Sequence, residues 1–481
     1  VFEGGRIMFD LSKPYCFYFN EIAKIPHGSY DEEKIADYIY KFGVDIGLKT
    51  IKDINNNVII YKEASKGYEN SAPLLLEAHM DMVCEKNKDS NHDFKKDPLD
   101  LYVEDGWLKA KGTTLGADDG TGVAYMLAIL ADDTLSHPKL ECVFTVEEEV
   151  GLCGALKLDT SLFKSRRMIC LDGGGEVSTG ISSAGGCIVT QTFDLKYVDN
   201  YKPTYRLFVS GLSGGHSGGE IHKEKGNANK LAFRILKELK GEVNLVSANG
   251  GLKDNAIPRE CEVIFSSDTN YSDIKKAVDQ SIINIKKELE FSDNGFKCTL
   301  EEVTSADKVV ETKTSKEIID YIFLLPNGFK HRSMAIEGLT LTSLNLGIIN
   351  TVDNKLIITS SLRSALECSI DHMIEEISTL ADIFNVDVSV SARYPGWNYK
   401  ANSDMRHKLN KIIERIYHKP LLEEATHGGC ECGIFAAISD DMDILTYGPI
   451  MKDIHTPDER LDIESFDRGY VVLTSLIKEC K

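Results

Sequence analysis

Long apolar runs are absent from this sequence of 481 residues. No stretch reaches the roughly 18 consecutive apolar residues that a membrane-spanning helix needs. The N-terminal segment Val1–Met8 also lacks the apolar core of a signal peptide. We therefore expect a cytoplasmic protein that has no membrane partner, and we leave residues 1–7 out of the fold prediction.

Positive charge is also scarce. The chain has 55 Lys and Arg against 75 Asp and Glu, which gives a formal net charge of −20. A field of this sign repels a phosphate backbone and an anionic lipid surface. The charge therefore argues against nucleic-acid and lipid partners.

Paired cysteine motifs are missing although the chain has 12 cysteines. No Cys-x-x-Cys occurs, and most cysteines stand in apolar runs such as residues 142–144. Cys430 and Cys432 are separated by one residue, which is poor spacing for a structural zinc site. We expect buried free thiols of a reducing compartment rather than a disulfide framework.

The first 185 or so residues alternate between apolar strands and helical patterns. Strands are predicted over 74–78, 140–146 and 168–171, and a helix over 121–130. This order is typical of an α/β domain with a largely parallel sheet. In such sheets, functional groups gather at the carboxyl ends of the strands.

The pattern changes after about residue 205 and returns near the C-terminus. Open alternation over 341–358 and a Lys/Glu-rich helix over 273–289 indicate an α+β segment with an antiparallel sheet. After Pro395-Gly396-Trp397, a helix near 404–417 and a strand near 444–447 resemble the first part again. Residues 8–185 and 398–481 are therefore predicted to form one domain, which residues 186–397 interrupt.

Hard metal ligands occur at five places at or near predicted strand ends. His79 and Asp81 are two residues apart on an extended chain, so their side chains point the same way and can face one site. There one of them can bind a metal while the other orients that ligand. The adjacent Asp118 and Asp119 precede a helix; a helix cap explains one of them, but two neighbouring carboxylates are costly unless a cation neutralises one.

The other three places have ordinary interpretations when each is taken alone. Residues 147–149 are three glutamates, which usually form a solvated face, and Asp172 and His455 stand in glycine- or proline-containing loops. The five places together provide His, Asp, Glu, Asp and His, a nitrogen and oxygen set that suits zinc. A common metal site explains this placement better than five unrelated surface positions.

Several longer motifs resemble the aminoacyl-histidine dipeptidases, the bacterial dipeptidase D group of the co-catalytic di-zinc peptidases. The most specific are residues 214–222 (GGHSGGEIH) and 226–230 (GNANK). The other matching stretches, in the family's order, are 79–83 (HMDMV), 112–120 (GTTLGADDG), 148–151 (EEVG), Asp172, 255–260 (NAIPRE), 360–364 (SSLRS) and 455–459 (HTPDE). The resemblance covers nearly the whole chain and implies a zinc-peptidase catalytic domain interrupted by a lid and dimerisation domain.

The resemblance implies two zinc ions per chain, for which manganese or cobalt can substitute. Their ligands would be His79 and Asp172 for one ion and Glu149 and His455 for the other, with Asp118 bridging both. The family has a cis peptide after the bridging Asp.

Two further residues take roles from the resemblance. Asp81 would support His79, and Glu148 would be the general base. Both glutamate assignments depend on the register of residues 147–149, and they fail together if that register slips by one residue.

In the inserted domain, the resemblance implies substrate contacts. His216 would stabilise the oxyanion, and Asn255 and Arg363 would bind the terminal carboxylate of the substrate, with Arg393 as a further candidate. An ordinary surface salt bridge or a dimer contact is the alternative for both arginines. His222, His427 and Glu431 also lie in family-like segments, and we assign them no role.

The expected activity is hydrolysis of unblocked dipeptides, notably Xaa-His such as β-alanyl-histidine, by a homodimer. A tripeptidase, a carboxypeptidase or an N-acyl amino acid deacylase with the same metals is the nearest alternative. A metal-binding scaffold without activity is disfavoured, because a scaffold does not need a general base such as Glu148 beside its ligands.

Overall fold

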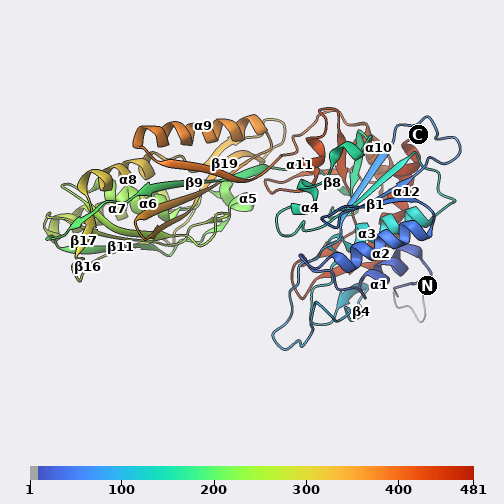
Figure 1. Ribbon diagram of the computed structural model, residues 1–481, viewed down its shortest axis with the longest axis horizontal. Coiled ribbons are helices and arrows are strands. Elements are labelled where there is room, and N and C mark those ends of the chain that lie inside the picture. The colour runs from blue at the N-terminus through green and yellow to red at the C-terminus, as the bar shows by residue number, and fades with distance from the viewer. Residues whose placement is uncertain (1–8) are drawn as a thin grey trace. The chain divides into compact units, whose positions relative to one another are not determined.

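The computed structural model describes residues 9–481, so residue 8, where we expect the first domain to begin, lies outside the described part. The chain packs as two compact units (Figure 1). Unit 1 contains the described residues up to Ser182, then Trp397–Ala425 and Cys430–Lys481. Unit 2 contains Ser183–Gly396 and Thr426–Gly429, so a four-residue segment that we expected in the first domain packs with the second.

The main sheet of unit 1 has six strands in the order β1-β2-β6-β3-β7-β23. Their bounds are β1 Lys49–Lys52, β2 Val58–Lys62, β6 Leu140–Thr145, β3 Leu74–His79, β7 Arg167–Cys170 and β23 Asp443–Thr446. The last four strands of that order run parallel, whereas β2 is antiparallel to both of its neighbours. Every residue of β2, β3 and β6 is buried, so both faces of the sheet are covered, as is usual for parallel strands.

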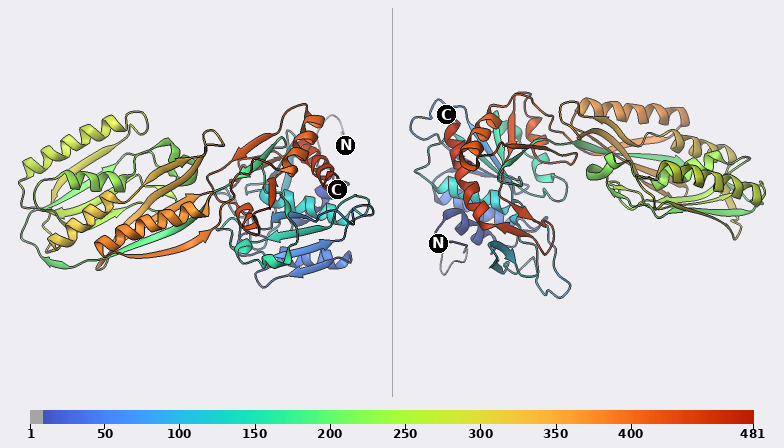
Figure 2. Two further views of the ribbon diagram at one scale, coloured as in Figure 1. Left: turned by 90° about the horizontal axis from the view of Figure 1, so that it is seen from above. Right: turned by 180° about the vertical axis from the view of Figure 1, so that it is seen from behind.

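Helices of unit 1 pack on this sheet. Their bounds are α1 Pro14–Ile22, α2 Glu33–Asp45, α3 Ala117–Ala131, α4 Cys153–Leu156, α10 Asp404–Tyr417, α11 Cys432–Ala436 and α12 Ile463–Glu479, with a 3₁₀ turn at Thr160–Leu162. Helix α3 is buried almost all round, because apolar residues occupy every side of it. Helices α10 and α12 lie side by side and are drawn in red in Figure 2. Their starts are capped by Ser403 and Asp462, whose side chains accept from backbone N–H groups.

Two small sheets complete unit 1. One has the order β24-β25-β5-β4, with bounds Met451–Lys452, Arg460–Asp462, Trp107–Ala110 and Leu101–Glu104. The other pairs β8 (Ser178–Ser182) with β22 (Leu422–Ala425) in parallel.

Unit 2 is built on a nine-stranded sheet in the order β16-β11-β15-β13-β19-β20-β9-β21, with β18 also paired to β19. Neighbouring strands of this sheet pair antiparallel. The bounds are β9 Gly185–Asp194, β11 Thr204–Ser210, β13 Asn244–Gly250, β15 Cys261–Ser266, β16 Lys297–Val303, β18 Gly328–Arg332, β19 Thr340–Val352, β20 Lys355–Ser364 and β21 Asp387–Tyr394. Short pairs lie beside it: β10 Tyr197–Asp199 with β17 Lys308–Val310, and β12 Gly215–His216 with β14 Ala256–Ile257.

Helices cover one face of the unit 2 sheet, as Figures 1 and 2 show. Their bounds are α5 Ser217–Glu220, α6 Ala228–Glu238, α7 Tyr271–Glu288, α8 Thr312–Leu324 and α9 Glu367–Phe384, with a 3₁₀ turn at Ile221–Lys223. Strands β9 and β11 alternate between buried and partly exposed residues, which is the pattern of a sheet with one packed face. The α6–α9 side chains and the buried side chains of the strands form a core separate from that of unit 1.

The predicted fold class is confirmed: a mixed α/β unit with a mostly parallel sheet and an α+β unit with an antiparallel sheet. The 12 cysteines all lie in the described part, and none of them forms a disulfide. Among residues 9–481, no helix has both the length and the apolar character needed to cross a membrane.

Candidate metal centre

The carboxyl ends of three parallel strands meet at one edge of the unit 1 sheet. In the register of the sheet, His79 at the end of β3 pairs with Thr145 at the end of β6, and Glu77 pairs with Cys170 at the end of β7. The residues that directly follow these ends therefore lie close together. Glu148 and Glu149 follow β6, and Asp172 follows β7.

Asp118 lies at the start of α3 and joins two histidines. Its Oδ1 is 3.2 Å from His79 Nε2, and its Oδ2 is 3.2 Å from His455 Nε2. The same His455 nitrogen is 2.8 Å from Glu149 Oε1. The peptide bond between Asp118 and Asp119 is cis, which confirms the expectation drawn from the resemblance.

Three sets of side chains bring ligand atoms within 4.8 Å of one another: His79, Asp118 and Asp172; Asp118, Glu149 and His455; and His79, Glu148 and Glu149. The first two sets share Asp118, whose two oxygens face different histidines. Imidazole nitrogens with carboxylate oxygens are ligands suited to zinc and similar divalent ions. The residues present therefore fit a pair of metal ions bridged by one carboxylate.

The electrostatics of this cluster also favour a cation. Burial and the neighbouring Asp118 raise the pKa of Asp172 well above its usual value. The pKa of Asp118 is lowered: burial opposes the shift, but hydrogen bonds from His455 and His79 outweigh it. Two buried carboxylates in contact cannot both be charged without compensation, so a divalent ion would relieve the repulsion.

Asp81 organises the residues around His79. The Nδ1 of His79 is 3.0 Å from the Asp81 carbonyl oxygen and 3.5 Å from Asp81 Oδ1. The Asp81 carboxylate also accepts hydrogen bonds from the backbone N–H groups of Glu148 and Glu149, at 3.0 and 3.3 Å, and from the Ser29 hydroxyl at 2.8 Å. This arrangement places a proton on Nδ1 and leaves Nε2 free to bind a metal.

Glu148 has the protonation behaviour of an acid–base group. Burial raises its pKa to about 8, with further contributions from nearby carboxylates, although His79 acts in the opposite direction. A carboxyl group that titrates near neutral pH can both take up and return a proton. Its neighbour Glu147 points elsewhere, since its carboxylate pairs with Lys157 at 3.5 Å.

In unit 2, the structure brings three of the predicted substrate residues to neighbouring positions. His216 on β12 pairs with Ala256 on β14, directly after Asn255. The backbone N–H of Ser217 donates to the Asn255 carbonyl at 2.8 Å. Burial lowers the pKa of His216, and the positive charge of the nearby Arg363 lowers it further.

The two arginine candidates differ in their partners. Arg393 is exposed, as are its partners, and forms ion pairs with Glu367 at 2.8 Å and Asp371 at 2.6 Å. Arg363 is 8% exposed, and its Nη1 donates to the Tyr394 hydroxyl at 3.3 Å. Within the described residues, no carboxylate pairs with Arg363, and its Nε is buried without a hydrogen-bond partner. Arg363 is therefore the better candidate to receive an anion.

His427 is a residue to which sequence reasoning assigned no role. Its Nε2 is 2.7 Å from the Ser343 hydroxyl, and burial together with the charge of Arg363 lowers its pKa to about 3. It belongs to the segment Thr426–Gly429, which packs in unit 2 although its sequence neighbours belong to unit 1. Its family-like sequence context was a signal, but only the fold shows that this imidazole lies near Arg363.

Glu431 was also left without a role. It accepts a hydrogen bond from the Thr145 hydroxyl at 2.6 Å and is buried beside Glu77, which raises its pKa. Because Thr145 pairs with His79 in the sheet, Glu431 lies beside the strand ends that precede the candidate ligands.

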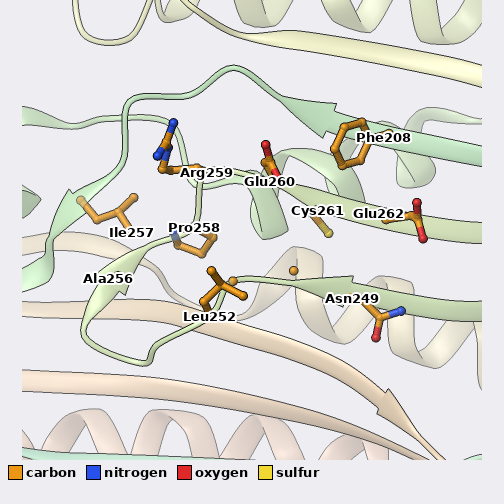
Figure 3. A pocket seen from close by; sticks show the side chains of 12 residues that line it. Phe208, Asn249, Leu252, Ala256, Ile257, Pro258, Arg259, Glu260, Cys261 and Glu262 are labelled. Carbon is orange, nitrogen blue, oxygen red and sulfur yellow. The ribbon is translucent and has the colours of Figure 1, made fainter. Parts of the chain in front are cut away.

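A separate pocket of about 420 Å³ opens in unit 2 (Figure 3). It is lined by Phe208 and by the segments 249–252 and 256–262, which flank Asn255 on both sides. Its lining contains no histidine, and its ionisable side chains other than Cys261 are Arg259, Glu260 and Glu262. The candidate for metal chemistry is therefore the centre in unit 1.

Comparisons with known proteins identify the family of the chain. Residues 75–479 match the family described as peptidase family M20/M25/M40. The chain is 35% identical over 474 residues to a cytosol non-specific dipeptidase of Escherichia coli (strain K12), and the match covers 97% of each chain.

Two solved structures are similar to this chain. An aminoacylhistidine dipeptidase from Vibrio alginolyticus superposes with a TM-score of 0.90 at 33% identity, covering 97% of this chain and 96% of that one. The aminopeptidase PepT from Bacillus cereus ATCC 10987 has a TM-score of 0.56 at 15% identity, with 98% of this chain and 100% of that one covered. The second likeness concerns the fold alone.

Proposed function

The chain belongs to peptidase family M20/M25/M40 and is therefore an enzyme that hydrolyses peptide bonds, and we propose that it is a dipeptidase that works with two metal ions held in unit 1. The observation that carries this proposal is the pair of ligand sets that share Asp118. Unit 1 would then be the catalytic domain, for which residues 8–185 and 398–481 were predicted. Unit 2 would be the lid and dimerisation domain.

The ligand sets support a specific assignment of residues to each of the two ions. His79 and Asp172 would hold one ion, Glu149 and His455 would hold the other, and Asp118 would bridge them. Zinc is our first choice, with manganese and cobalt as substitutes, because the ligands are imidazoles and carboxylates without thiolates. When bound, such a pair of ions polarises the scissile carbonyl group and activates the attacking water.

The chain's own residues handle the proton. Glu148 would accept a proton from the attacking water on its carboxylate and pass it to the nitrogen of the departing amine. Its raised pKa supports this role, and so does its backbone, which Asp81 fixes through the Glu148 N–H. Glu149 is assigned as the ligand because it lies in one set with Asp118 and His455.

Unit 2 supplies groups for a substrate that carries a free carboxylate. The buried guanidinium of Arg363 can form two parallel hydrogen bonds to a carboxylate, and Asn255 can add another. The carboxylate partners of Arg393 already neutralise its charge, so we assign it the weaker part in substrate binding.

His216 has the geometry of a hydrogen-bond donor. Its Nδ1 accepts from the backbone N–H groups of Gly218 and Gly219, at 3.2 and 3.3 Å. The proton of the neutral ring must therefore be on Nε2, where it can be donated to a developing oxyanion. The lowered pKa of His216 keeps the ring neutral at physiological pH.

Two relatives that match nearly the full chain have dipeptidase in their names, and one of these names specifies aminoacylhistidine substrates. We therefore propose unblocked dipeptides as substrates, with Xaa-His such as β-alanyl-histidine among them, in a cytoplasmic homodimer. A tripeptidase, carboxypeptidase or deacylase remains the competing activity.

A substrate panel tests this proposal. The purified chain, loaded with zinc, manganese or cobalt, is offered Xaa-His and other dipeptides, matched tripeptides, N-acetylated dipeptides and N-acyl amino acids. We expect turnover of free dipeptides and at least tenfold lower kcat/KM for the blocked and longer peptides. Turnover of tripeptides or N-acyl amino acids alone would replace the dipeptidase assignment by one of its competitors, and light scattering in solution tests the dimer.

A further inference from the structure

A single buried carboxylate contacts the backbone just before Asp118. Glu459 Oε2 accepts hydrogen bonds from the N–H groups of Leu115 at 2.8 Å and Gly116 at 3.2 Å, and its Oε1 accepts from Ala117 at 2.8 Å. The N–H of Asp118 itself points to the same oxygen at 3.5 Å. Glu459 is 3% exposed, so these contacts are shielded from water.

These amide groups have no local partner. They lie at and just before the start of α3, where the first N–H groups of a helix have no carbonyl oxygen to bind. The N-cap position is Gly116, which has φ of 68° and no side chain with which to cap the helix. The positive end of the helix attracts an anion, and a residue 342 positions from Ala117 in the sequence provides it.

Glu459 is itself held firmly. It directly precedes β25, which pairs with β5 through Arg460 and Lys109. Its backbone N–H donates to the Thr456 carbonyl at 3.0 Å, which closes the turn that directly follows His455. The same short segment therefore presents His455 to the centre and holds the backbone that presents Asp118.

We propose that Glu459 is a positioning residue of the metal centre, which sets the separation between Asp118 and His455 by tying their two segments together. The inference rests on the proposed function, because that separation matters only if Asp118 bridges two ions. Glu459 touches neither the substrate nor the proposed ions. It acts through the backbone of residues 115–118.

Glu459→Gln is the main test variant. Gln keeps the size of the side chain but has one acceptor oxygen, and its NH₂ group would face a backbone N–H. Loss of such an outer contact typically weakens metal binding about 10–100-fold. We expect the more weakly held ion to need a free metal concentration about tenfold higher, or more, for half-saturation. Excess metal should restore kcat, and KM should not change.

Asp462→Asn is the matched control. Asp462 also caps a helix, α12, by accepting from the Ser465 N–H at 2.8 Å, but it does not hold a ligand segment. A merely structural role of Glu459 predicts that both variants lower Tm and that neither changes the metal titration. Unchanged metal affinity in Glu459→Gln, or an equal loss in Asp462→Asn, would overturn the proposal.

Two further measurements keep the outcomes separate. If Glu459→Gln does not fold, Glu459→Asp retains the charge with a shorter reach and should give the same metal phenotype in milder form; a wild-type titration from a folded Glu459→Asp would overturn the proposal. The wild-type titration tests the proposed function on its own, because a wild-type chain that binds fewer than two ions contradicts the bridged pair whatever Glu459 does.

Discussion

Glu149 and His455 are 306 residues apart in the sequence, yet Glu149 Oε1 lies 2.8 Å from His455 Nε2. Hydrogen bonds with Asp118 and Glu149 raise the pKa of His455 to about 10. In this arrangement the imidazole is protonated, and its proton occupies the region between ligand atoms where a cation would bind. Metal binding must therefore displace that proton.

Metal affinity should accordingly rise with pH. His79 and His455 both have raised pKa values in the metal-free centre, the first because hydrogen bonds with Asp118 and Asp81 outweigh burial. Each must be neutral at the nitrogen that binds the ion, so lower pH competes with metal. Calorimetric titration in buffers of different ionisation enthalpy should count protons released per ion and show tighter binding at pH 8 than at pH 6.

Removal of the metals should abolish activity reversibly. A chelator that strips the ions also removes the binding free energy that favours the folded state, so we expect Tm to fall. Return of zinc should restore turnover as about two equivalents bind, measured by elemental analysis. Full activity in a metal-free sample, or saturation at one equivalent, contradicts the bridged pair.

Glu148→Gln should remove the general base and leave the ligands intact. We expect kcat to fall about 10²–10⁴-fold, which is the usual contribution of such a group. Two ions should still bind, and KM should change little.

Glu147→Gln is the neighbouring control, because its carboxylate pairs with Lys157 and not with the cluster. We expect it to retain activity within about twofold, as for an exposed ion pair. If instead Glu147→Gln is inactive and Glu148→Gln is normal, the general base is Glu147, and the assignments within residues 147–149 are wrong by one residue.

Glu148→Gln should also stabilise the metal-free protein at alkaline pH. Burial raises the pKa of Glu148 from 4.5 to about 8, so the folded chain holds a proton that the unfolded chain has lost between these values. Stability therefore falls as pH rises through this window, by about 1.4 kcal/mol for each unit of pKa difference. Metal-free Glu148→Gln should unfold at higher denaturant concentration than metal-free wild type at pH 8, and the two curves should converge toward pH 4.5.

Arg363→Ala should weaken substrate binding far more than Arg393→Ala. We expect KM to rise by tenfold or more for the first variant, and Arg363→Lys to recover only part of the loss because it cannot form a two-pronged contact. Arg393→Ala breaks exposed ion pairs and should change KM by less than twofold. Equal effects of the two alanine variants would mean that both arginines contact the substrate.

Local patterns predicted much of the fold because they report burial directly. The helix predicted near 404–417 coincides with α10, and the strand predicted at 74–78 is β3 with one more residue. Both segments have a strong apolar period and a clear start or end. The parallel sheet followed from the alternation of such segments.

Only part of the candidate metal centre could be predicted from the sequence. Candidate ligands that follow strands, such as Asp172, could be proposed from position and chemistry, and the resemblance added His455 to the proposed set. The contacts of Glu459 could not, because they are hydrogen bonds to backbone groups more than 340 residues away that leave no mark in composition. The ion pairs of Arg393 and the place of His427 also depend on tertiary packing.

The strand order of unit 1 has a consequence for synthesis of the chain. β23 completes the parallel sheet beside β7, and His455 follows it, although the other ligand segments lie before residue 183. Domains tend to fold as they leave the ribosome, N-terminal parts first. In a nascent chain, unit 2 can fold before the last strand of the unit 1 sheet is made. A translation product that ends before His455 therefore cannot contain all of the proposed ligands.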